Sequence, residues 1–255
     1  FSNVDLPALG RPTSATYPER VGGVVAGSDG SGGIRRSYRG NASTQGRAGL
    51  GAYIEGRTQR SSPEPAELVQ LPYVIRAFGH RAFGGIPVRI RGGVNRGRRW
   101  SVVALGRGYG SGTFGRDRLE ALAAVTRPGD AFWDVGAHKG FITLAASGMV
   151  GPSGQVVAVE PSVTNLRFLR RHLGWNRVGN ASVVAVALSD APGETSFGGR
   201  GSSIAFRMGE GPETAEVATV ERLVAERRLP RPNVLKLDVE GAEARVLRGM
   251  GRLLG

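Results

Sequence analysis

The sequence has 255 residues, 40% of them hydrophobic, which suffices for one main domain core with additional segments. Its formal net charge is +13, and the basic residues are nearly all arginine, with lysine only at Lys139 and Lys236. Because the chain is also rich in glycine and alanine, we favour codon bias in GC-rich DNA over nucleic-acid binding as the origin of this charge. The absence of cysteine excludes disulfides, thiolate zinc sites and cysteine nucleophiles.

Metal, membrane and targeting signals are missing from the sequence. The histidines His80, His138 and His172 do not have the spacing of metal ligands. No apolar run reaches the roughly 18 to 20 residues that span a bilayer, and the N-terminus has no signal-peptide pattern. We therefore expect a cytoplasmic protein with no membrane partner and no metal site. Since the chain begins with Phe1 and stops within a predicted helix, we also expect a fragment that lacks its last strands.

The first half of the chain is predicted to hold two units. Residues 1–64 are dense in glycine, serine and arginine without lasting periodicity, so we expect a disordered extension. Residues 65–128 are predicted to form a β-rich and helical lead-in. Its helical candidate is 66–79, its alternating segment 86–105 indicates strands joined by turns, and a second helix ends before Pro128.

Strands and helices alternate regularly in the third predicted unit, residues 129–255. The predicted strands are 131–136, 155–160, 181–188 and 233–239, and the predicted helices are 140–150, 162–175, 219–228 and 242–254. A hairpin is expected within 189–218. This alternation predicts an α/β fold, with a doubly wound and mostly parallel sheet that helices cover on both faces. In the second helix, Val163, Leu166, Leu169 and Leu173 share the face expected to be buried.

The run D-V-G-A-H-K-G, Asp134 to Gly140, joins the first strand to its helix. It has one residue too few between its glycines for a P-loop and lacks the middle glycine of the dinucleotide fingerprint. We expect Gly136 to let a ligand approach the backbone and Gly140 to let the helix begin close to the sheet. An acidic Asp134 suits the amino group of a cofactor such as S-adenosylmethionine. The alternative is a turn that only closes a βα unit.

Two later strands also end in carboxylates. Glu160 ends the second strand, where a carboxylate can accept hydrogen bonds from ribose hydroxyls. The segment LKLDVEGAE ends the fourth strand and turns Asp238 and Glu240 toward one side at the carboxyl edge. We interpret Glu243 as an acid that stabilises the first turn of the following helix. A magnesium site at Asp238 and Glu240 lacks further obvious ligands.

From about Arg89 to its end, the chain resembles the FkbM family of S-adenosylmethionine-dependent methyltransferases. The resemblance rests on RPGDAFWDVGAHKGFITLAA, GPSGQVVAVEPSVTNLRFLRRHLGWN, VVAVALSD and VLKLDVEGAEARVLRGM. It implies a Rossmann-like class I methyltransferase fold and O-methylation of a sugar or natural-product hydroxyl, so the expected partner is a small-molecule or glycan acceptor. The implied cofactor-binding residues are Asp134, Gly136 and Ala137 at the methionine part, with Gly140 in the same turn, Glu160 at the ribose, Ala187 and Leu188 at the adenine, and Asp238 at the methyl-donor end.

Two residues are candidate bases for removing the proton of the acceptor hydroxyl. Asp238 lies at the carboxyl edge, and His138 has an unperturbed pKa near 6.5, although it is equally suited to a solvent-facing loop. The sequence departs from the family at His138 and Lys139, where Asn and an apolar residue are frequent, and at Val220-Glu221, where the family has Leu-Asp. The alternative functions are a truncated, non-catalytic cofactor-binding domain and an arginine-rich protein that binds or methylates nucleic acid.

Overall fold

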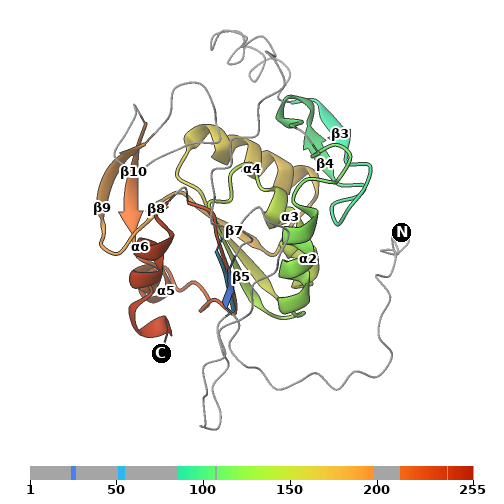
Figure 1. The fold of residues 1–255 in the computed structure, drawn as a ribbon. Helices are drawn as coiled ribbons and strands as arrows, with labels where there is room; N and C mark the ends of the chain where they lie inside the picture. Colours follow the sequence, from blue (N-terminus) through green and yellow to red (C-terminus); the bar gives the residue numbers. More distant parts are fainter. Residues whose placement is uncertain are drawn as a thin grey trace, which may run out of the picture.

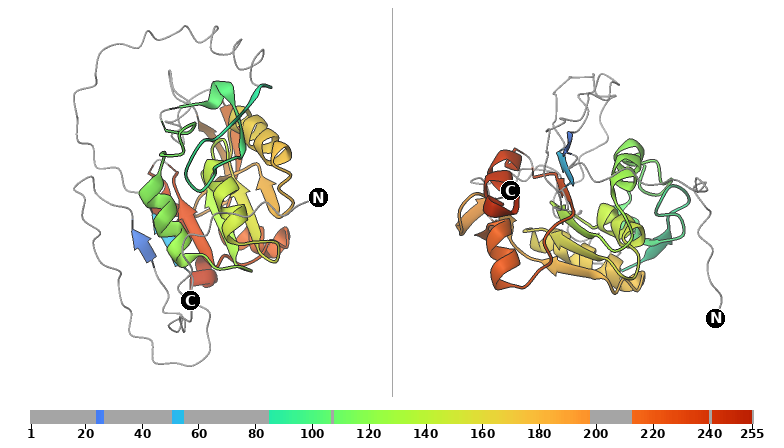
Figure 2. Two further views of the ribbon diagram at one scale, coloured as in Figure 1. Left: turned by 90° about the vertical axis from the view of Figure 1, so that its right-hand side faces the viewer. Right: turned by 90° about the horizontal axis from the view of Figure 1, so that it is seen from below.

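The central element of the fold is a parallel sheet of six strands, shown in Figures 1 and 2. The computed structural model describes residues 24–26, 51–54, 85–106, 108–197, 213–239 and 241–254. The strand order is β1-β2-β11-β5-β6-β7, and every neighbouring pair is parallel. The bounds are β1 Val24–Ala26, β2 Gly51–Ile54, β5 Ala131–Val135, β6 Gln155–Val159, β7 Ala181–Val184 and β11 Val234–Leu237. The predicted α/β, Rossmann-like fold is confirmed.

Helices cover both faces of this sheet. The helices are α2 Arg116–Val125, α3 Phe141–Met149, α4 Val163–Trp175, α5 Val220–Glu226 and α6 Glu243–Arg248. Phe132 of β5 and Ala158 of β6 belong to the core formed with α2, α3 and α4, whereas Trp133 and Val157 belong to the core formed with α5 and α6. Because both faces are buried, these strands read as continuous apolar runs.

The predicted strand 181–188 is divided between two sheets. Its first part is β7, and its last two residues form β8, Ala187–Leu188, in a second sheet of order β8-β10-β9. This sheet contains the predicted hairpin, β9 Gly193–Phe197 and β10 Glu213–Ala218, which pair antiparallel. The chain leaves the main sheet after Val184, whose carbonyl accepts the last sheet-edge bond from the Glu160 N–H.

The lead-in contains the antiparallel pair β3 Pro87–Arg89 and β4 Arg99–Ser101, followed by the 3-10 turn η1 Val102–Ala104. The helical candidate 66–79 lies outside the described residues. So does most of the extension 1–64, from which the structure describes β1 and β2. Within the described ranges, no helix is both long and apolar enough to cross a membrane.

Two helices differ from their predicted extent or face. The helix predicted over 242–254 ends at Arg248, and η2 Gly251–Leu254 follows it. The chain passes close to the Ser189 carbonyl at Gly249, where a side chain would collide with that oxygen. In α4, the predicted apolar residues are buried except Val163, which is 64% exposed because it begins the helix.

Candidate functional site

The turn from Gly136 to Gly140 joins β5 to α3 at the carboxyl edge of the sheet. Three of its residues have positive φ, namely Gly136 (74°), His138 (52°) and Gly140 (90°). A Cβ on Gly136 would collide with the backbone oxygen of Asp238, and a Cβ on Gly140 would lie 2.5 Å from Leu169 Cδ1. The positive φ favours glycine at both positions, and at Gly136 the contact with the Asp238 backbone requires it as well. Gly136 admits the end of β11, and Gly140 lets α3 begin against α4.

The turn is bonded on one side to β6 and to Glu160. The N–H groups of Gly136 and Ala137 donate to the Val159 carbonyl at 2.9 and 3.0 Å, and the His138 N–H donates to Glu160 Oε2 at 2.7 Å. Glu160 Oε1 accepts from the Ser162 N–H at 3.0 Å and from Asn165 Nδ2 at 3.1 Å. The Glu160 carboxylate is therefore fixed beside the turn.

The Glu160 side chain has acceptor capacity left for a ligand. Burial raises the pKa of its carboxyl, and hydrogen bonds from Ser162, Asn165 and His138 and the charge of Lys236 act in the opposite direction. A carboxylate oxygen can accept two hydrogen bonds, and in the described part of the chain Oε2 accepts one. The remaining acceptor position on Oε2 thus fits a ribose hydroxyl, which would donate to it and is the group predicted to lie here.

The turn is bonded on its other side to β11 through a buried ion pair. Asp134 is 0% exposed and Lys236 2% exposed, and Lys236 Nζ lies 3.0 Å from Asp134 Oδ1. The same ammonium donates to the carbonyls of Gly136 at 2.8 Å and Val135 at 3.2 Å. Thr143 Oγ1 donates to Asp134 Oδ2 at 2.6 Å. Asp134 thus bonds to α3 and β11 inside the protein. The sequence reading missed Lys236, for which the signal is one cation within an apolar strand.

Asp238 follows β11 at the same edge, and its side chain is 33% exposed. Its N–H donates to the Val135 carbonyl at 3.1 Å. Its carboxylate Oδ2 lies 3.6 Å from Arg118 Nη1 of α2 and 4.0 Å from Lys236 Nζ. The structure therefore brings Asp134, Gly136 and Asp238 together, with two cations that the sequence reading did not include.

The two other carboxylate residues near Asp238 in the sequence are Glu240 and Glu243. Glu240 lies outside the described residues. Glu243 begins α6, and its Oε1 accepts from the N–H groups of Val239 and Gly241 at 3.2 Å each, so it stabilises the turn before the helix. Among the residues that the structure describes, no group of three or more metal-binding side chains could hold an ion.

Three further residues predicted for the site are His138, Ala187 and Leu188, which contact the rest of the protein through the backbone or within its core. His138 is partly exposed, and its backbone rather than its ring makes the bond to Glu160. Ala187 and Leu188 are 7% and 3% exposed and pair in β8 with Val217 and Ala218 of β10. Leu188 packs in the core formed with α5 and α6.

A second buried group, His172 of α4, connects the turn to the lead-in. The ring accepts the Ser101 N–H at Nε2 (3.0 Å) and donates from Nδ1 to the Lys139 carbonyl (2.7 Å), so it is neutral with its proton on Nδ1. It stacks on Trp100 with ring centroids 3.7 Å apart. Burial, with smaller effects of the Lys139 and Arg171 charges, lowers its pKa to about 4.

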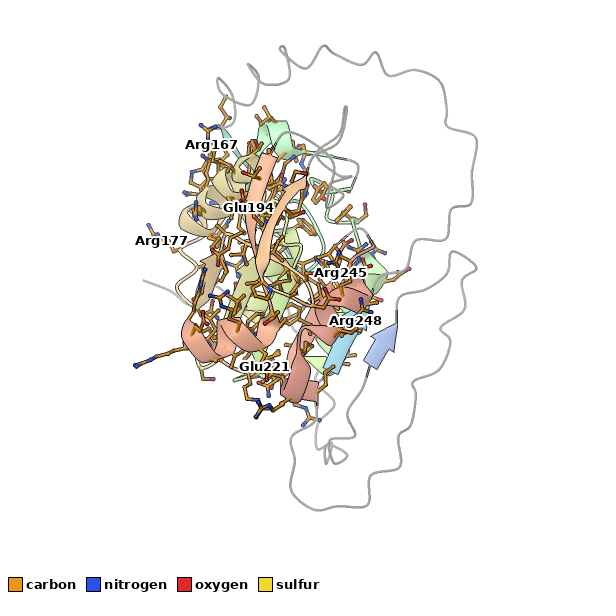
Figure 3. The ribbon with its side chains drawn as sticks, turned by 90° about the vertical axis from the view of Figure 1, so that its left-hand side faces the viewer. Arg167, Arg177, Glu194, Glu221, Arg245 and Arg248 are labelled. Carbon is orange, nitrogen blue, oxygen red and sulfur yellow. The ribbon has the colours of Figure 1, made fainter. Side chains whose placement is uncertain are left out.

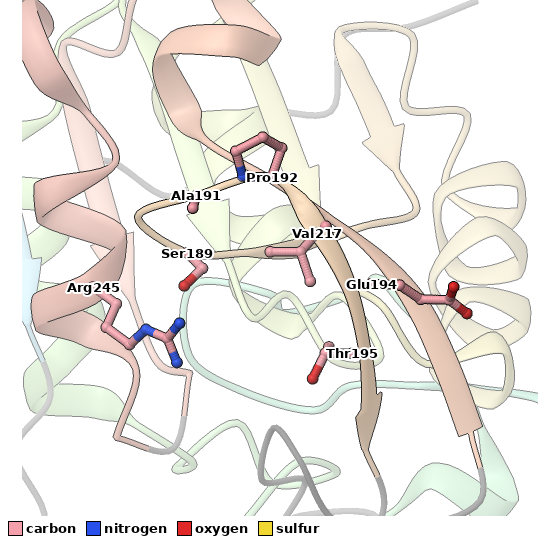
Figure 4. A pocket seen from close by; sticks show the side chains of 8 residues that line it. Ser189, Ala191, Pro192, Glu194, Thr195, Val217 and Arg245 are labelled. Atoms are coloured by element: carbon pink, nitrogen blue, oxygen red, sulfur yellow. The ribbon is translucent and has the colours of Figure 1, made fainter.

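A pocket lies apart from this edge, between α6 and the β9–β10 hairpin (Figure 4). It is lined by Ser189, Ala191, Pro192, Gly193, Glu194, Thr195, Val217 and Arg245. Beside it, Asp190 Oδ1 and Oδ2 pair with Arg245 Nε at 3.2 Å and Arg248 Nη2 at 3.0 Å, and Figure 3 shows both arginines on α6. None of the predicted site residues lines the pocket.

Comparison with known proteins gives the following matches. Residues 134–255 match the family model of the methyltransferase FkbM domain. The hexuronic acid methyltransferase AglP of Haloferax volcanii is 30% identical over 144 residues, which is 54% of this chain and 57% of that protein. The chain thus spans little more than half of this relative.

Two solved structures are similar to parts of the chain. Methyltransferase FkbM from Methylobacillus flagellatus KT is 19% identical with a TM-score of 0.36, covering 53% of this chain and 36% of that one. Precorrin-6y C5,15-methyltransferase from Geobacter metallireducens GS-15 is 17% identical with a TM-score of 0.36, covering 55% and 57%.

Proposed function

Because residues 134–255 of this chain belong to the FkbM methyltransferase family, we propose that the protein transfers a methyl group from S-adenosylmethionine to a hydroxyl of a sugar-type acceptor. The observation that carries this proposal is the position of the Glu160 carboxylate. It lies against the glycine turn at the carboxyl edge, where open α/β sheets bind ligands, and keeps acceptor capacity on Oε2.

The residues at this edge have separate tasks in the proposed reaction. When bound, S-adenosylmethionine supplies an electrophilic methyl group on a sulfonium. Glu160 accepts a hydrogen bond from a ribose hydroxyl. The exposed apolar side chain of Val163, three residues later, offers a surface for the adenine ring. Asp238, one-third exposed at the end of β11, accepts a hydrogen bond from the hydroxyl of the methyl acceptor and orients that hydroxyl for the displacement. His138 remains the second candidate base.

The proposed acceptor class is a hexuronic acid. This choice is supported by the name of the relative from Haloferax volcanii. It is also supported by Arg118, a cation 3.6 Å from the candidate base that could balance the charge of an acidic sugar. The proposed methyl acceptor is therefore a hydroxyl of a hexuronic acid, which is either a free sugar or part of a glycan.

Calorimetric titration with S-adenosylhomocysteine tests the cofactor assignment. We expect wild-type binding and, for Glu160→Gln, an affinity lower by about tenfold, because the amide replaces one carboxylate oxygen with a donor that cannot accept a ribose hydroxyl. Arg222→Met, which removes an exposed cation paired with Glu226, is the control and should bind like the wild type. Absence of wild-type binding would contradict the proposal.

The acceptor assignment is tested with S-adenosylmethionine and either glucuronic acid or glucose. A methylated glucuronic acid, detected by mass spectrometry, is the expected product, and Asp238→Asn should reduce its rate by about a hundredfold if Asp238 takes the proton. Retention of that rate in Asp238→Asn, with loss in His138→Gln, would move the role of base to His138. Methylation of glucose in preference to glucuronic acid would contradict the acceptor class.

A further inference from the structure

Five polar side chains form a continuous row between the sheet and the helices α2 and α3. The row runs from Thr143 through Asp134, Lys236 and Asp238 to Arg118, with successive separations of 2.6, 3.0, 4.0 and 3.6 Å. Its inner end is fully buried, whereas Asp238 at the carboxyl edge is one-third exposed. Lys236 is the central member and touches both the turn and the candidate base.

The neutralisation of Asp134 does not account for all the bonds of Lys236. An ammonium has three N–H donors, and Lys236 directs two of its contacts to the carbonyls of Val135 and Gly136. Those carbonyls begin the turn whose following N–H groups, at Gly136, Ala137 and His138, are bonded to Val159 and Glu160. The carbonyls of Val135 and Gly136 are thus bonded to β11, and the N–H groups of Gly136, Ala137 and His138 to the end of β6.

We propose that Lys236 is a positioning residue for methyl transfer, which fixes the backbone of the turn 136–138 and thereby the site of the methionine part of the cofactor. This inference rests on the proposed function. Lys236 is 2% exposed and acts through the turn, so it is not a catalytic residue. Its charge also keeps two carboxylates, Asp134 and Asp238, at one end of the site.

A purely structural role is the competing explanation, because removing one member of a buried ion pair leaves the other charge unpaired. Lys236→Met alone does not separate the two roles, since its buried Asp134 would lose its counter-charge. The double variant Asp134→Asn/Lys236→Met removes both charges together. Asn can still accept from Thr143, so this variant is expected to fold. The Gly136 carbonyl loses the donor Lys236, whereas the Val135 carbonyl keeps its bond from the Asp238 N–H.

The test compares two ligands that differ in the methionine part. Calorimetry measures the affinities of S-adenosylhomocysteine and 5′-methylthioadenosine, with circular dichroism and thermal unfolding to establish that each variant is folded. For the double variant we expect the affinity for S-adenosylhomocysteine to fall about tenfold or more, and the affinity for 5′-methylthioadenosine to change less than about twofold. Arg222→Met, on the exposed face of α5, is the control that should change neither.

The outcomes separate this inference from the proposed function. A folded double variant in which both affinities fall equally, or in which neither changes, overturns the positioning role of Lys236. If the wild type binds neither ligand, the proposed function fails first and the inference fails with it. A selective loss for the ligand that carries the methionine part supports the positioning role.

Discussion

Gly136 shows how tightly the turn is constrained at the level of one residue. Its φ of 74° disfavours any side chain, and the Asp238 carbonyl occupies the place of a Cβ. Gly136→Ala should therefore lower the free energy of unfolding by about 3 kcal/mol or more, since strain in φ and a backbone collision add. Urea unfolding followed by circular dichroism measures this loss.

Gly97 provides the matched control for that substitution. It has a similar φ of 82°, but no atom lies within 4 Å of where its Cβ would be. Gly97→Ala should cost about 1 kcal/mol, the strain in φ alone. Equal losses in the two variants would show that the approach of β11 does not constrain Gly136.

At the same scale, the residue types of the site could be predicted more fully than their contacts. Asp134, Gly136, Glu160 and Asp238 were selected because strand ends and glycine spacing are local patterns. Lys236 was missed because its partners, Asp134 and Gly136, lie about 100 residues away in the chain, and a local pattern does not state which strands become neighbours.

Among the elements, α4 and the lead-in are joined to the turn by one neutral histidine. The pKa of His172 is about 4 in the folded protein, below its ordinary 6.5, because the buried ring disfavours the charged form. Between these values the unfolded chain binds more protons, so the stabilisation is complete above pH 6.5 and is lost as the pH falls toward 4. We expect the free energy of unfolding to decrease by about 3 kcal/mol over this range.

Urea unfolding at pH 7, 5.5 and 4.5 measures this dependence, and His172→Gln isolates it. The variant should be less stable at pH 7, because it loses stacking on Trp100, and its stability should vary less between pH 6.5 and 4. The Glu160 carboxyl, with its raised pKa, titrates in both proteins and cancels in the difference. Parallel pH curves for the two proteins would contradict the assignment to His172.

The elements with strong periodicity were predicted well, and those that depend on distant partners were not. The strands β5, β6 and β11 and the helices α3, α4 and α5 lie where the apolar pattern indicated. The division of 181–188 into β7 and β8 follows from pairing with β10, some 30 residues later, which no local signal reveals. Similarly, the early end of α6 reflects its close approach to Ser189.

For the molecule as a whole, β2 adds residues 51–54 to the sheet that carries the candidate site. β2 pairs in parallel with β11 from Gly51↔Val234 to Ile54↔Leu237, so β11 has a neighbour on both sides. The sequence did not predict this strand, because residues 1–64 carry no lasting periodic pattern and were expected to form a disordered extension. A strand of only four residues that forms by pairing with an adjacent strand is too short to show a periodic pattern in the sequence.

Ala52→Pro tests the pairing of β2 with β11. Proline removes a backbone donor and is poorly accommodated between two strands, so β2 should detach and expose the edge of β11. We expect faster hydrogen exchange, measured by mass spectrometry, at residues 234–237 and unchanged exchange in β6, which serves as the internal reference. Wild-type exchange rates at 234–237 would show that β2 does not protect this strand.

The buried pair of Asp134 and Lys236 also determines how β5 and β11 align. The two residues are direct partners in the parallel register. A slip of one residue would turn Lys236 to the opposite face of the sheet, beside Trp133 and Val135 of β5, where it would be an unpaired charge. The apolar residues alone do not distinguish these alignments, because both faces are buried. One ion pair thus selects the alignment that brings Asp238 level with the turn.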